Sequence, residues 1–107
     1  MSKTIALTTV FEDAVYGVPM SYHVIEHIST EKNLRTDSGS ATAVVASYAG
    51  KAAHARGKGA LATTALNFGG WDGSEPEAWL YAKLAADEQD GGGNTNPFYK
   101  AKPVLAD

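Results

Sequence analysis

The residues with the clearest chemical potential in this sequence are the two histidines of His23-Val24-Ile25-Glu26-His27. Their spacing fits H-x-x-E-H, in which two histidines one helical turn apart bind zinc and the glutamate activates water. That chemistry needs a helix, whereas the β-branched and aromatic neighbours favour a strand. In a strand the histidines would lie about 13 Å apart, too far for one ion to bridge. We therefore predict a strand here, and a small metal- or anion-binding module using His23 and His27 is the alternative.

A basic segment is the second candidate for chemistry. Gly57-Lys58-Gly59, preceded by Arg56, resembles part of a phosphate-binding loop, but the residue after Lys58 is not the Ser or Thr that a P-loop requires. We interpret the segment as a turn with solvated cations. Large aromatic side chains contribute much of the energy of protein interfaces. Lys51, Arg56, Lys58 and Trp71, which lies in a glycine loop, therefore form the candidate interaction surface.

Other patterns associated with catalysis or metal binding are incomplete. The acidic run Asp87-Glu88-Gln89-Asp90 lacks the spacing of a calcium-binding loop, because no glutamate closes it. No serine lies in a G-x-S-x-G nucleophile elbow. We predict no catalytic residue, no metal and no cofactor, and we expect that the protein is not an enzyme.

Composition narrows the class of protein. The chain has 107 residues, of which 44% are hydrophobic and 20% charged, as expected for one globular domain. Its net charge of −3 argues against a nucleic-acid partner, and the absence of cysteine removes disulfides and thiolate ligands. No segment approaches the roughly 20 apolar residues of a membrane helix. The first residues lack the apolar region of a signal peptide, so we expect synthesis in the cytoplasm and no membrane contact.

Alternation of apolar and polar residues predicts four β-strands, at residues 3–11, 20–29, 41–48 and 60–68. The polar stretch 30–40 predicts that the second and third strands form a hairpin. Between the third and fourth strands, the alanines of residues 51–56 predict a connector of one or two helical turns.

One longer helix is predicted after the fourth strand. Ser74 is its expected N-cap, because Glu77 lies three residues further on and completes an S-x-x-E capping box. The helix is expected to end near Asp87. Leu80 and Leu84 are four residues apart, which predicts that one helix face packs on the sheet.

These elements predict an α+β fold, a mainly antiparallel sheet of about four strands with one C-terminal helix packed on a face. Residues 1–87 form the predicted domain. Residues 88–107 are expected to be a flexible glycine-rich linker and C-terminal tail. Within them, residues 97–105 fit either a tail, which we favour, or a short edge strand interrupted by Pro103.

Three segments carry a resemblance to a known group of proteins: Tyr22-His23-Val24-Ile25-Glu26, Tyr48-Ala49-Gly50-Lys51-Ala52-Ala53-His54-Ala55-Arg56-Gly57-Lys58 and Ala78-Trp79-Leu80-Tyr81. Together they resemble small proteins encoded in the tail-gene regions of bacteriophages and prophages, a family without established activity. The resemblance spans roughly residues 3–84 and brings no catalytic residues with it.

The resemblance implies a phage-derived structural or accessory protein of tail or virion assembly that acts through protein–protein contacts. Its expected partners are other phage structural proteins or further copies of itself. Its expected location is the cytoplasm of the bacterial host when synthesised, and then the virion. A prophage-encoded inhibitor of a host protein is a further alternative.

Overall fold

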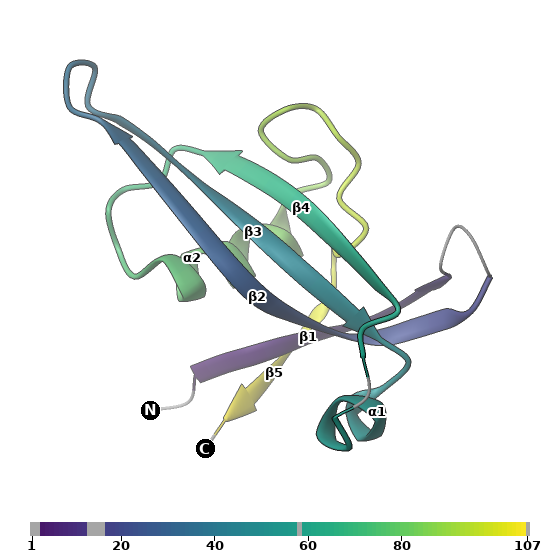
Figure 1. Cartoon of the computed structure of the whole chain (residues 1–107). Coiled ribbons are helices and arrows are strands. Elements are labelled where there is room, and N and C mark those ends of the chain that lie inside the picture. Colours follow the sequence, from purple (N-terminus) through teal and green to yellow (C-terminus); the bar gives the residue numbers. More distant parts are fainter. Residues whose placement is uncertain (1–2, 13–16, 58, 107) are drawn as a thin grey trace.

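The computed structural model describes residues 3–12, 17–57 and 59–106. Within these ranges the elements are β1 (Lys3–Glu12), β2 (Pro19–Asn33), β3 (Ser38–Tyr48), α1 (Lys51–Ala55), β4 (Ala62–Gly69), α2 (Pro76–Ala86) and β5 (Lys102–Ala106). The strands form one antiparallel sheet in the order β4-β3-β2-β1-β5, with α2 on one face (Figure 1). The predicted α+β class is confirmed, with five strands in place of about four and with the connector formed as the short helix α1.

β2 and β3 form the predicted hairpin, and it is longer than expected. Pairing continues as far as Asn33 and Ser38, so most of the predicted connection at residues 30–40 is paired strand. The side-chain oxygen of Asn33 accepts hydrogen bonds from the amides of Arg35 and Thr36, at 3.0 and 3.3 Å. This local bond closes the turn and keeps the polar strand ends in register. The hairpin projects beyond the rest of the sheet (Figure 1).

The segment expected to be a linker and tail returns to the sheet instead, as strand β5 paired with β1. Asn96 stabilises the path of the chain back to the sheet, because its side-chain amide donates to the carbonyl oxygens of Leu84 and Asp87, at 2.7 and 2.8 Å. Phe98 follows and is fully buried. Pro103 is tolerated within β5 because the strand lies at the edge of the sheet. The edge-strand alternative is the correct one for this segment.

Helix α2 begins one residue later than its predicted cap implies. Glu75, not Ser74, is the N-cap, and its carboxylate accepts from the amides of Glu77 and Ala78, at 3.1 and 2.9 Å. The hydrogen bond from the Ala78 amide, and to a smaller extent that from the Glu77 amide, lowers the pKa of Glu75. The prediction of Ser74 was wrong because Pro76 occupies the first helical position and leaves Glu75 at the cap.

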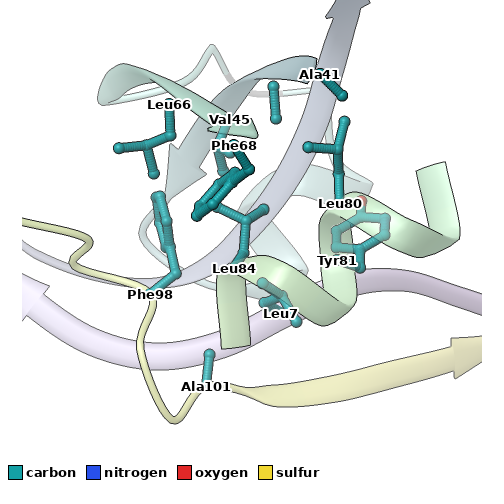
Figure 2. Packing of buried hydrophobic residues seen from close by; sticks show 11 residues of the cluster. Leu7, Ala41, Val45, Leu66, Phe68, Leu80, Tyr81, Leu84, Phe98 and Ala101 are labelled. Atoms are coloured by element: carbon teal, nitrogen blue, oxygen red, sulfur yellow. The ribbon is translucent and has the colours of Figure 1, made fainter. Parts of the chain in front are cut away.

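The main core lies between α2 and the sheet face that it covers. Figure 2 shows the side chains of α2 directed toward those of β3 and β4. The buried residues of this core are Leu7, Ala41, Ala43, Val45, Leu66, Phe68, Leu80, Tyr81, Leu84, Phe98 and Ala101. The prediction that Leu80 and Leu84 face the sheet is confirmed.

A smaller apolar cluster occupies the opposite face of the sheet. It contains Ala6, Tyr22, Ala46 and Tyr48, all buried. Helix α1 lies at one end of this face and contacts β2 and β3. Among the described residues the two faces are therefore covered unequally, by the eleven residues of α2 on one and the five of α1 on the other.

Tyr81 of α2 ties the helix to two strands at once. Pairing of β1 with β2 stops at Leu7 and His23. Beyond that point the buried Tyr81 hydroxyl accepts from the Ile25 amide at 3.0 Å and donates to the Ile5 carbonyl at 2.9 Å. Burial raises the pKa of Tyr81, which keeps the hydroxyl protonated and able to donate.

We predict that Tyr81→Phe lowers the free energy of unfolding by about 2–4 kcal/mol, because two backbone groups inside the fold lose their partner while the ring stays in place. Urea denaturation measures the change. Tyr99→Phe is the matched control, since the Tyr99 hydroxyl bonds no other described residue, and it should change stability by less than about 0.5 kcal/mol. Equal stability of Tyr81→Phe and the control would contradict a bridging role for the hydroxyl.

Candidate functional site

His23 is a buried core residue with both ring nitrogens engaged. Its Nε2 lies 2.8 Å from the carbonyl oxygen of Thr9 and its Nδ1 lies 2.9 Å from the hydroxyl of Ser47. A carbonyl only accepts, so Nε2 carries the hydrogen and Nδ1 accepts from Ser47. The ring stacks on Phe11 at 4.9 Å and lies 5.0 Å from the ring of Phe98. Neither nitrogen retains a lone pair for a metal ion.

The other histidine of the motif lies on the opposite face of the sheet. His23 pairs with Ser47 of β3, whereas His27 pairs with Val44, because the register shifts between Ile25 and His27. Cross-strand partners share a face, and successive residues of β3 alternate between faces. The predicted strand is confirmed, and this geometry keeps the two imidazoles from meeting at one ion.

Burial lowers the pKa of His23, and the hydrogen bond to Thr9 opposes this effect only in part. The groups that bond the ring or stack on it are the Ser47 hydroxyl, the Thr9 carbonyl and the aromatic rings of Phe11 and Phe98, all uncharged. No carboxylate among these contacts compensates a protonated imidazole. The fold therefore stabilises the neutral ring.

His54 of α1 belongs to an aromatic cluster on the other face. Its ring lies 5.2 Å from that of Tyr22 and 4.8 Å from that of Tyr48. The Tyr48 hydroxyl donates to the Glu26 carboxylate at 3.0 Å. Glu26, the glutamate of the H-x-x-E-H pattern, therefore accepts a hydrogen bond from a tyrosine and is not placed to activate a water molecule.

The residues of the candidate interaction surface do not come together. Trp71 lies beside Gly39, at the start of β3, where Gly70 and Trp71 donate to the Gly39 carbonyl at 2.9 and 3.2 Å. Lys51 and Arg56 are exposed and belong to α1 and its C-cap, beyond the far end of β3. An eleven-residue strand separates the two places by about 35 Å. Lys58 lies outside the described residues.

Trp71 itself is half-buried. It packs against the main core, and its indole nitrogen donates to the Ser74 carbonyl at 3.0 Å. A side chain at Gly39 would place its Cβ 2.6 Å from the Trp71 carbonyl oxygen, so the close approach of the two backbones requires glycine there. The indole closes the loop that leads into α2.

One apolar groove, of about 240 Å³, lies between α2 and strands β1 and β5. It is lined by Thr4, Leu7, Ala78, Tyr81, Ala82, Ala85 and Pro103. The Tyr81 hydroxyl already bonds two backbone groups, so the groove would contact a ligand mainly through its apolar side chains. In the described part of the chain, no group of three or more His, Cys, Asp or Glu side chains converges on a common point.

An open edge of the sheet lies at β4, a strand that sequence reasoning did not identify as an edge. Gly91 donates to the carbonyl oxygen of Asn67 at 2.6 Å, and the Asn67 amide donates to the Asp90 carboxylate at 3.4 Å, so both groups point away from β3. Alternate residues of a strand direct their amides and carbonyls to the same side. Thr63 and Ala65 therefore also present theirs outward, and no other described residue bonds these groups.

The other open edges carry features that discourage strand pairing, whereas β4 does not. β5 contains Lys102 and Pro103, and the distal part of β2 carries Glu31 and Lys32. The sequence of β4, ATTALNFG, has neither charge nor proline. Charged residues and proline are the usual protections of an edge strand. A run of alternating residues without charge was a usable signal, but the sequence did not show that this strand lies at the edge.

Comparison with known proteins finds no relative, so the function is argued from the geometry of the structure. The chain matches no family model, and neither a curated protein nor a solved structure matches it significantly. None of the helices in the described ranges is long and apolar enough to cross a membrane.

We predict that the free energy of unfolding falls as the pH drops below about 6.5, the ordinary pKa of histidine, because the unfolded chain then binds a proton that the folded state resists at His23. The slope reaches at most about 1.4 kcal/mol per pH unit for one group. Urea denaturation at pH 7.5, 6.5 and 5.5 measures it.

His23→Gln should be less stable at pH 7.5 and should lose most of this slope. The matched control is His27→Gln, at an exposed position of the same strand, which should keep the slope. An unchanged slope in His23→Gln would show that another group is responsible.

Proposed function

We propose that this chain is a structural or accessory protein of a phage-derived particle, in tail or virion assembly, and that it acts through protein–protein contacts. The observation that carries the proposal is the uncharged, proline-free edge of β4. There Thr63 and Ala65 offer outward amides and carbonyls that no other described residue bonds. The resemblance to small proteins of phage tail-gene regions supports the same role.

The contact works by strand addition. A strand of the partner lies along β4, and backbone hydrogen bonds at Thr63 and Ala65 supply the attachment. Side chains of the incoming strand alternate between the two faces of the enlarged sheet. On the face opposite α2 they meet Thr63 and Ala65, which are small and exposed, so the partner strand can carry larger residues there.

The proposed surface suits a particle component for a further reason. Asp90 and Gly91 cover β4 at Asn67, so the open part of the edge is short and its end is fixed. A short edge with a fixed end admits a partner strand in few registers, and defined register is what an ordered assembly requires. The partners are other structural proteins of the particle or further copies of the chain, made in the cytoplasm of a bacterial host.

We predict that Thr63→Pro reduces incorporation of the chain into particles at least tenfold. Proline removes an amide that points away from β3, so the β3–β4 ladder keeps its own hydrogen bonds while the partner loses one. Particles from an induced host strain that expresses the variant are purified, and mass spectrometry measures the amount of chain.

Thr63→Val is the matched control, because it changes the side chain at the same exposed position and keeps the amide. It should be incorporated like the wild type, and thermal unfolding of both variants checks their folding. Absence of the wild-type chain from purified particles, or equal incorporation of a folded Thr63→Pro, would overturn the proposal.

A further inference from the structure

We infer that copies of this chain associate head to tail, with Leu34 at the tip of the β2–β3 hairpin of one copy packed into the apolar groove between α2, β1 and β5 of the next. The inference goes beyond the proposed function, because it uses two surfaces other than the β4 edge. A contact between two different surfaces of one chain is heterologous, so repetition of the contact builds an open series or a closed ring.

The tip of the hairpin presents an apolar side chain to solvent. Leu34 is 89% exposed, more than any other large apolar side chain of the described residues. The hairpin carries it beyond the rest of the sheet (Figure 1). The turn around it is held by the side chain of Asn33, which accepts two backbone amides, and by the ion pair of Lys32 with Asp37 at 3.4 Å. A side chain on a fixed turn loses little conformational freedom when it docks.

The groove has the size and lining for such a side chain. Leu7 and Tyr81, both buried, form its floor, and Ala78, Ala82 and Pro103 are exposed at its rim. Its volume of about 240 Å³ lies below the roughly 300–1,000 Å³ of pockets that hold small-molecule ligands. The groove therefore suits one apolar side chain of a protein partner better than a separate ligand.

Leu105 extends the apolar surface beside the groove. It pairs with Thr4, which lines the groove, and cross-strand partners share a face of the sheet. Its side chain is 52% exposed in the single chain. A tip that enters the groove thus gains apolar contact at the rim as well as at the floor.

The hairpin tip of a chain cannot reach the groove of the same chain. Leu7, in the floor of the groove, pairs with His23 of β2. Leu34 lies eleven residues further along than His23, just past the end of β2. At strand spacing this separation is roughly 35 Å. The contact must therefore join two molecules.

One end of the groove carries an excess of negative charge. The groove residues Thr4 and Ala78 directly follow Lys3 and Glu77 in the sequence, and these two form an ion pair at 2.6 Å. The hydrogen bond to Glu77 raises the pKa of Lys3, and the nearby charge of Glu75 adds to this effect. Two carboxylates and one ammonium therefore gather at this end, which leaves one negative charge unbalanced.

The hairpin tip carries the complementary charge, and this selects a second copy as the occupant. Within residues 32–37, Asp37 balances Lys32, whereas none of the described carboxylates pairs with the exposed Arg35. The tip thus has one unbalanced positive charge directly beside Leu34. Opposite charges on two surfaces orient their encounter, so Arg35 directs the tip to the carboxylate-rich end of the groove.

Sedimentation velocity on the chain without terminal tags tests the inference, since Lys3 and Ala106, at the two ends of the sheet, lie near the groove. The wild type should shift from monomer to a series of larger species between about 10 µM and about 1 mM, the range in which an interface below standard size dissociates. Leu34→Asp removes the apolar tip, and Ala82→Arg fills the groove. Each variant alone should associate about tenfold more weakly, because burial of one leucine stabilises by at least that factor.

A mixture of the two variants gives the sharpest result. The Ala82→Arg copy keeps its tip and the Leu34→Asp copy keeps its groove, so one contact can form between them. The resulting pair has neither a second intact tip nor a second intact groove. The mixture should therefore form a one-to-one dimer and stop there, which non-specific apolar association would not do.

Leu34→Met and Ala82→Ser are the matched controls, because the first keeps an apolar tip and the second keeps an open groove at an exposed position. Both should associate like the wild type. Arg35→Glu should associate more weakly at low salt, since it brings a carboxylate to Glu75 and Glu77.

A wild type that stays monomeric up to about 1 mM would overturn head-to-tail association. So would Leu34→Asp or Ala82→Arg that associates like the wild type, or a mixture of the two that forms no dimer or grows beyond it.

These results are separable from a failure of the proposed function. A monomeric chain whose incorporation into particles still depends on the Thr63 amide overturns head-to-tail association and keeps the β4 edge as the contact with a partner. A chain that shows the stopped dimer in the mixture, and is absent from particles, supports head-to-tail association and overturns the particle role.

Discussion

The hydroxyl of Tyr81 is the contact on which the arrangement of helix and sheet depends. β1 and β2 stop pairing after Leu7 and His23, and one phenol bridges the amide of Ile25 and the carbonyl of Ile5 where the strands part. Tyr81 and Ile5 are 76 residues apart in the sequence, so this bridge fixes α2 against a strand formed at the other end of the chain. The packing of Leu80 and Leu84 into the main core follows from that position.

A second polar anchor lies deeper, at His23, and explains why a motif with the spacing of a zinc site serves structure here. The imidazole joins β1 through Thr9 and β3 through Ser47, while aromatic rings enclose it. A buried polar group that satisfies both nitrogens fixes the register of three strands more strictly than apolar packing alone. Glu26, the glutamate of the motif, accepts a hydrogen bond from Tyr48 on the opposite face.

Sequence reasoning recovers what is local and misses what depends on distant contacts. Alternation predicts the first four strands and the hairpin of β2 and β3, because the period of two follows directly from strand geometry. It favours a tail over the edge strand β5, since the glycines before Asn96 indicate a linker. The bonds of Asn96 to α2 and the burial of Phe98 instead return the chain to the sheet. The candidate site, the open edge of β4, is not predicted for the same reason. Strand order decides which strand is the edge, and that order follows from long-range pairing.

The strand order also has a consequence for attachment. Lys3 of β1 pairs with Ala106 of β5, so the first and last described residues of the sheet are neighbours, while β4 forms the opposite edge. Figure 1 shows the start of β1 and the end of β5 side by side, away from β4. A fluorescent protein, an affinity tag or a further domain joined at either end would extend from the same side of the molecule. The architecture thus separates a side for tethering from the side that carries the open edge of β4.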